Sequence, residues 1–228
     1  MKLTIRLFML IAAVLLLASC AMLPGFVSDA QNEFEEGLSL FNSGRYQEAI
    51  PRFQRATDLD PNFGRAYLYL GRSYIGLKSW REALTPLRTA YRLSPEETKR
   101  EALDLLIDAL FAGGLDAFKT GNFESSVEYF KEVLGLQPTS AKARSEFLKA
   151  LIAHGGNSLS RGHLPQAISA YTEAVKLSPN SFDAVFGLAK ALWRNGEISK
   201  ALEAATAAVR VEPGNSKIQS FLQELQRR

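Results

Sequence analysis

The chain of 228 residues is long enough for one or two ordinary domains, and 22% of its residues are charged. Its formal net charge is +3, and this near balance of basic and acidic residues gives no indication of a nucleic-acid partner. The chain has one cysteine, Cys20, which excludes an internal disulfide.

The first element along the chain is a short apolar segment at the N-terminus. Residues 7–18 form an unbroken apolar run of 12, and the basic residues Lys2 and Arg6 precede it. A helix that crosses a bilayer needs about 20 apolar residues, so this run is too short to span one. A basic start followed by a run of this length is typical of a secretory signal peptide. We therefore predict that residues 1–19 are a signal peptide.

The end of this run, Leu17-Ala18-Ser19-Cys20, resembles the lipobox of bacterial lipoproteins. In that family the signal is cut before the cysteine, which then carries a diacylglycerol on its sulfur and an acyl group on its new amine. The resemblance implies that lipid on Cys20 attaches the chain to a membrane of the bacterial cell envelope, since several acyl chains hold where one is marginal. Ala21, where an aspartate resembles an inner-membrane retention signal, favours the periplasmic face of the outer membrane in a Gram-negative cell. The alternative is an incidental thiol.

The next segment, residues 20–29, is predicted to be a short lipid-anchored tether, and helical hairpins follow it. Between residues 64 and 95, apolar residues recur every three or four positions in two bursts, which is the spacing of one face of a helix. The residues that mark the two helices and close the second are Tyr67, Leu70, Gly71, Tyr74, Ala83, Leu87, Ala90 and Pro95.

The same pattern occurs five times along the chain. Closing prolines lie 34, 43, 41 and 34 residues apart, at Pro61, Pro95, Pro138, Pro179 and Pro213. A hairpin this short cannot bury its apolar face alone, so it predicts a stacked array. The residues and the period of about 34 resemble the tetratricopeptide repeat family. The resemblance implies an all-α, right-handed solenoid of antiparallel helix hairpins, with about five repeats and a C-terminal capping helix.

The predicted repeats are 30–63, 64–97, 98–140, 141–181 and 182–214, and the predicted capping helix is 215–228. Repeats three and four carry nine and seven extra residues, which predict longer first helices. Each of these helices contains a glycine pair, Gly113-Gly114 or Gly155-Gly156. Glycine weakens a helix but allows close packing, so the pairs indicate either tight helix contacts or a hinge between halves of the solenoid.

In proteins that the chain resembles, the first helices line a concave side that receives an extended peptide or a partner helix. The residues predicted to line this groove are Phe34, Phe41, Leu68, Arg72, Ile75, Phe111, Phe118, Ile152, Leu159, Phe186, Lys190 and Trp193. Apolar residues beside cations predict a partner with apolar anchors and some acidic groups. For each residue, packing against the neighbouring repeat is an equal alternative. The family's clamp for C-terminal carboxylates uses lysine and asparagine where this chain has Phe34 and Leu38, which argues against that role.

The repeats leave no block of sequence for a catalytic domain, and we predict that the chain is not an enzyme and holds no cofactor. His154 and His163 are the only histidines, and without clustered carboxylates they make a poor metal site. We expect a scaffold or adaptor, such as a pilotin-like assembly factor, that holds an envelope protein or peptide near the membrane. The alternative is a regulator that delivers substrates to an envelope protease or peptidoglycan hydrolase. The sequence does not predict an oligomeric state.

Overall fold

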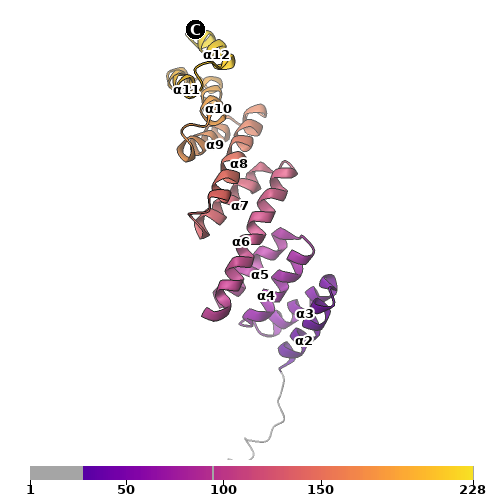
Figure 1. Ribbon diagram of the computed structural model, residues 1–228. Helices are drawn as coiled ribbons and strands as arrows, with labels where there is room; N and C mark the ends of the chain where they lie inside the picture. Colours follow the sequence, from indigo (N-terminus) through magenta and orange to yellow (C-terminus); the bar gives the residue numbers. More distant parts are fainter. Residues whose placement is uncertain (1–27, 94, 228) are drawn as a thin grey trace, which may run out of the picture.

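The computed structural model describes residues 28–93 and 95–227, and all regular structure in these ranges is helical. The helices follow one another in an elongated stack from α2 at one end to α12 at the other (Figure 1). Their bounds are α2 Asp29–Asn42, α3 Tyr46–Leu59, α4 Gly64–Gly76, α5 Trp80–Leu93, α6 Glu96–Lys119, α7 Phe123–Leu136, α8 Ala141–Ser160, α9 Leu164–Leu177, α10 Phe182–Arg194, α11 Ile198–Val211 and α12 Ser216–Gln226. The predicted all-α solenoid is confirmed. The predicted signal peptide, Cys20 and the tether up to residue 27 lie outside the described residues.

The helices pair as five hairpins, from α2–α3 to α10–α11, and each second helix also contacts the first helix of the next hairpin. The turn inside each hairpin contains one residue with positive φ, which reverses the chain after the first helix. Four of these residues are glycines, with φ between 73° and 82°, and the second hairpin uses Lys78 at 58°. Glycine is favoured here because it has no Cβ to clash in the left-handed conformation.

Inside each of the first four hairpins, a glycine on the first helix faces a bulky side chain on the second. A Cβ added at any of these glycines would lie 2.6 to 2.9 Å from that side chain, which leaves no room for one. The four pairs are Gly37 with Phe53, Gly71 with Leu87, Gly114 with Phe130, and Gly155 with Tyr171. The contact brings the two helix backbones close together and buries the larger side chain at no more than 5% exposure.

The first helices of repeats three and four are longer than the rest. Helix α6 has 24 residues and α8 has 20, whereas the other helices of the five hairpins have 13 or 14. Both run without interruption through their glycine pairs. A Cβ at Gly113 would lie 3.2 Å from Trp80, and one at Gly156 would lie 3.4 Å from the hydroxyl of Tyr171. These contacts favour the close-packing interpretation of the glycine pairs.

The last helix, α12, covers the end of the fifth repeat. Ile218, Phe221 and Leu225 are buried in one cluster with the inner residues of α10 and α11. Asn215 precedes the helix, and its side-chain oxygen accepts a hydrogen bond of 3.1 Å from the amide of Lys217. The residues on the outer face are mostly polar and exposed, which is what a terminal element needs to keep a solenoid soluble.

Substitution of two glycines should separate tight packing from helix propensity. A Cβ at Gly187 would lie 2.1 Å from the ring of Tyr171, so Gly187→Ala should destabilise the fold by about 1–3 kcal/mol through overpacking. Gly135 lies in α7 with nothing within 4 Å of an added Cβ, so Gly135→Ala should stabilise it by up to about 1 kcal/mol. Thermal unfolding followed by circular dichroism checks both signs, and a stable Gly187→Ala variant would contradict the packing described.

Candidate protein-binding face

The first helices of the repeats form one side of the stack. Helix α2 contacts α4, α4 contacts α6, α6 contacts α8 and α8 contacts α10, so the outward residues of the first helices make a continuous surface. We call this surface the inner face. It consists of the accessible residues Phe41, Arg72, Ile75, Phe111, Leu115, Phe118, Ile152, Phe186, Lys190 and Trp193.

Three residues predicted for the groove are buried instead. Phe34 is 0% exposed, Leu68 is 3% exposed and Leu159 is 8% exposed. The ring of Phe34 lies 4.9 Å from that of Phe63, directly before α4, and 5.6 Å from that of Tyr69 on α4. These three side chains therefore take the alternative role, packing between helices, and are not available to a partner.

At the N-terminal end of the inner face, the accessible groups are already engaged with one another. The ring of Phe41 lies 5.2 Å from that of Tyr69, and the guanidinium of Arg72 lies 5.2 Å above the same Tyr69 ring. Arg72 also forms an ion pair of 3.0 Å with Glu101 on α6. Arg72 therefore links α4 of the second repeat to α6 of the third. Ile75 packs partly against the core of these repeats.

The middle of the inner face carries an exposed apolar patch on α6. Leu115 is 43% exposed and Phe118 is 37% exposed, and among the described residues they are the large exposed hydrophobics of the first helices. With Phe111 they follow the spacing i, i+4, i+7, which places all three side chains on one face of the helix. We call these three residues the α6 patch. Leu115 was not among the residues predicted for the groove, although this spacing is visible in the sequence.

Phe111, the third member of the α6 patch, connects it to the core and to a cation. Its ring lies 5.4 Å from that of the buried Phe130, and the ammonium of Lys142 lies over the ring of Phe111, 4.4 Å from its centroid. Phe118 contacts Phe123 at 5.3 Å between ring centroids. The patch is therefore held by the core on one side, while Leu115 and Phe118 remain accessible.

The C-terminal part of the inner face combines two aromatic rings with a lysine. Phe186 and Trp193 lie 5.5 and 5.4 Å from the ring of Phe221 in the capping helix, and the ammonium of Lys190 lies 4.5 Å above Phe186. Burial lowers the pKa of Lys190, as do the nearby charges of Lys217 and Arg194, while Asp183 acts in the opposite direction. The partly buried charge of Lys190 would be stabilised by an acidic group from outside the chain. Ile152 on α8 packs partly into the core between repeats four and five.

The two histidines lie together in a polar pocket of about 250 Å³ between the α6–α7 turn and α8. Arg161 and Glu124 line the same pocket. In the described ranges, no group of three or more histidine, cysteine, aspartate or glutamate side chains is arranged to hold a metal ion. A search of the same ranges finds no helix with the length and hydropathy needed to cross a bilayer.

Comparison with known proteins agrees with the repeat structure. Sequence models of the tetratricopeptide repeat match residues 34–98 and 153–216, and a further model of this repeat matches residues 117–140. The chain belongs to the tetratricopeptide repeat family. Proteins built from this repeat are generally scaffolds for protein–protein interaction rather than enzymes, because the stacked hairpins form extended binding surfaces. Comparison with curated proteins gives no match.

The chain is also similar to several solved structures. A tetratricopeptide repeat protein from Bacteroides fragilis is 14% identical with a TM-score of 0.52, over 87% of this chain and 98% of the other. The tetratricopeptide domain of P58(IPK) is 17% identical with a TM-score of 0.42 over 88% of this chain, which spans 65% of that domain. The TPR2AB domain of yeast Sti1, solved in complex with pHSP90, is 17% identical with a TM-score of 0.33, over 86% of this chain and 83% of that one.

The lowered pKa of Lys190 predicts a dependence of stability on pH. The folded chain releases the Lys190 proton more readily than the unfolded chain, so the unfolded state binds more protons just below the ordinary pKa of 10.5. Stability should therefore rise with pH in that range, relative to a variant without the lysine. Lys190→Met should lose this rise and be the more stable protein near neutral pH.

Thermal unfolding of both proteins from neutral pH to about pH 10 measures the difference. Lys119→Met, which removes an exposed lysine from the end of α6, is the control and should keep the profile of the unaltered chain. A Lys190→Met variant that is less stable at neutral pH would contradict the account.

Proposed function

We propose that the chain is a membrane-anchored scaffold of the bacterial cell envelope that binds a partner protein or peptide on the inner face. The observation that carries the proposal is the α6 patch. It leaves the large apolar side chains of Leu115 and Phe118 exposed in the middle of the inner face, whose other residues are partly buried. Soluble proteins rarely expose large apolar side chains next to one another, and such patches are typical of protein-binding sites.

The chemistry around the patch supports a partner with apolar anchors and acidic groups. Lys142 lies over Phe111 and Lys190 over Phe186, so basic groups flank the apolar surface on its C-terminal side. An acidic partner would pair with these ammonium groups without disturbing the core, while its apolar side chains would contact Leu115 and Phe118. This combination is the one by which grooves lined by helices recognise amphipathic segments.

Membrane attachment rests on the N-terminal segment. A basic start, an apolar run too short to span a bilayer and a single cysteine two residues after its end are the features of a lipoprotein signal. Helix α2 begins at Asp29, only nine residues after Cys20. Nine residues reach at most about 30 Å when extended, so a lipid on Cys20 would hold the first repeat beside the membrane. Because Ala21, and not an aspartate, follows Cys20, we propose that the lipid attaches the chain to the periplasmic face of the outer membrane in a Gram-negative cell.

The α6 patch can be tested by two charge substitutions. The double variant Leu115→Asp and Phe118→Asp should weaken partner binding by about 30-fold or more, as expected for the loss of apolar anchors at the centre of an interface. Both side chains are exposed, so the helical circular dichroism signal should not change. The measurement is crosslinked capture of the partner from detergent-solubilised membranes, compared between the variant and the unaltered chain.

The matched control is Leu59→Asp, which adds a charge at a leucine that is 55% exposed on α3, outside the inner face. It should capture the same partner as the unaltered chain. Full capture by the double variant would show that the partner uses another surface.

The lipid anchor can be tested separately with Cys20→Ala. We expect the unaltered chain in the outer-membrane fraction of a Gram-negative host and the variant in the soluble periplasmic fraction, because the acyl chains provide the attachment. Mass spectrometry of the unaltered protein should detect the acyl groups. Retention of the variant in the membrane would contradict the lipid anchor, but it would not affect the proposal that a partner binds the inner face.

A further inference from the structure

Ion pairs join the second helices of successive repeats at a recurring position. Arg88 on α5 pairs with Glu132 on α7, with Nη2 to Oε2 at 2.6 Å. Lys131 on α7 pairs with Glu173 on α9 at 3.3 Å. The two cations are 43 residues apart and the two carboxylates 41, which are the offsets of the closing prolines at these repeats. The pairs are therefore one structural device used twice.

This device is missing at the next junction, between α9 and α11. The offsets of 41 and 34 residues place Thr172 and Ala207 at the positions of the cation and the carboxylate. Neither side chain is charged, so no ion pair covers the space between these two helices. Ion pairs therefore join α5 to α7 and α7 to α9, whereas no such pair joins α9 to α11.

The first junction, between α3 and α5, also lacks the ion pair but differs in another residue. Its equivalent residues are Gln54 and Thr89, and the first helix below them carries Tyr67, which packs against the core that includes Leu87. At the α9–α11 junction the residue equivalent to Tyr67 is Val185. Valine has a smaller side chain than tyrosine, and Val185 is 3% exposed where it lines the space between α9 and α11.

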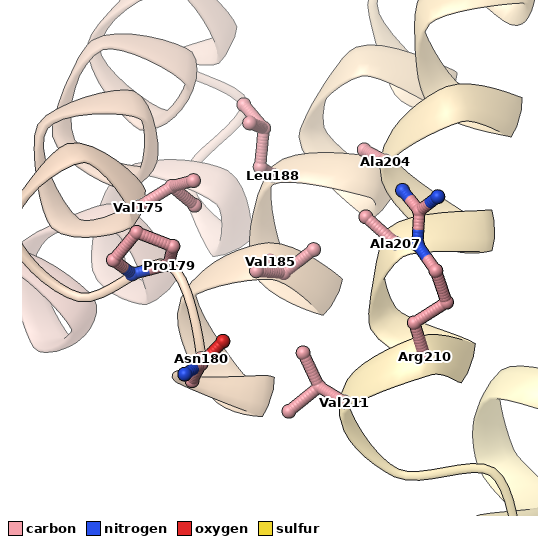
Figure 2. A pocket seen from close by; sticks show the side chains of 9 residues that line it. All are labelled: Val175, Pro179, Asn180, Val185, Leu188, Ala204, Ala207, Arg210 and Val211. Carbon is pink, nitrogen blue, oxygen red and sulfur yellow. The ribbon is translucent and has the colours of Figure 1, made fainter.

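A cavity of about 710 Å³ lies at this junction. Its walls are largely apolar and come from three helices, as Figure 2 shows, with Val175 on α9, Val185 and Leu188 on α10, and Ala204, Ala207 and Arg210 on α11. We call this cavity the outer groove. Its size is in the range of sites that take a ligand or a few side chains of a partner.

The charge at the outer groove is positive. None of the described residues that line it is acidic, and its one charged group is the exposed guanidinium of Arg210, which extends along α11 beside Ala207 in Figure 2. In the described ranges Arg210 makes no ion pair. Lys176, an exposed lysine in the last turn of α9, adds to the positive potential. A carboxylate on the occupant would complement this charge.

We propose that the outer groove is a second docking site, for a partner polypeptide that inserts a large apolar side chain and places a carboxylate beside Arg210. It goes beyond the proposed function because it uses a different surface. Val185 and Leu188 lie on one face of α10, while Phe186, Lys190 and Trp193 lie on another, so a segment in the outer groove leaves the inner face free. The scaffold can then hold two partners at once.

The chain itself supplies two ways to close the groove. Val185→Tyr introduces the larger residue that α4 carries at the equivalent position, and the double variant Thr172→Lys with Ala207→Glu copies the ion pair of the second and third junctions. The probe is a fluorescent alanine-based helical peptide of about 20 residues with one phenylalanine and a glutamate four positions away. Its binding to the full chain in detergent is measured by fluorescence anisotropy.

We expect each closed variant to bind the peptide at least about tenfold more weakly than the unaltered chain. Arg210→Gln should weaken binding by about threefold, and only for the peptide with glutamate, not for a peptide with glutamine in its place. Ala207→Ser, which keeps the groove open, and Leu115→Asp, which alters the inner face, should bind as the unaltered chain does. Retained binding by Leu115→Asp separates this proposal from that of the inner face.

Three results would overturn the proposal. The first is no saturable binding of the peptide to the unaltered chain. The second is equal binding by both closed variants when their thermal unfolding shows that they are folded. The third is binding of laurate, an apolar anion with no backbone, to the same groove while the peptide does not bind, which would assign the groove to lipid instead of protein.

Discussion

The structure depends on one recurring contact inside the hairpins. A glycine on the first helix packs against a bulky side chain on the second. Gly114 against Phe130 and Gly155 against Tyr171 are two examples, each with no space for a Cβ. Such a contact brings two helices together but buries only part of their apolar surface, so each hairpin must also pack against its neighbours. The inner face exists because this stacking places every first helix on the same side.

The fold could be predicted from the sequence because its signals are local and repeated. The closing prolines set the boundaries of the hairpins, and helical spacing gave the two helices of each. The lengths of α6 and α8 followed from the wider proline spacings. The glycine pairs left two interpretations open, since a glycine allows both a close contact and a bend. The choice depended on what lies opposite each glycine, here Trp80 and Tyr171, and that is a property of packing rather than of sequence.

The candidate site could be predicted only in part. Position in the repeat showed which side chains point away from the partner helix, but not how far the next repeat covers them. Phe34 is covered by Phe63 and Tyr69 and is fully buried, whereas Phe118 at a later position of its own repeat is accessible. Helical spacing from Phe111 would have added Leu115. No residue pattern in the sequence indicates the outer groove. It lies where Thr172 and Ala207 replace the ion-paired residues of other junctions and Val185 stands where α4 has a tyrosine.

The stacked repeats offer a partner an elongated surface with apolar contact points and basic groups near them. Buried clusters shared by neighbouring repeats hold them together, and the exposed ion pairs of Arg72 with Glu101 and between second helices add contacts at the surface. The surface offered to a partner is therefore formed before the partner arrives, which reduces the entropy cost of binding. Where the bridging groups are absent, between α9 and α11, the same architecture leaves an opening.

The most direct measurement of the central claim is site-specific photo-crosslinking in living cells that produce the protein. A photoreactive phenylalanine analogue replaces Phe118 in one strain and Leu59 in another, and the crosslinked products are identified by mass spectrometry. The account predicts one dominant envelope protein crosslinked from position 118 and absent from position 59. Crosslinks of equal strength from both positions, or none from position 118, would contradict it.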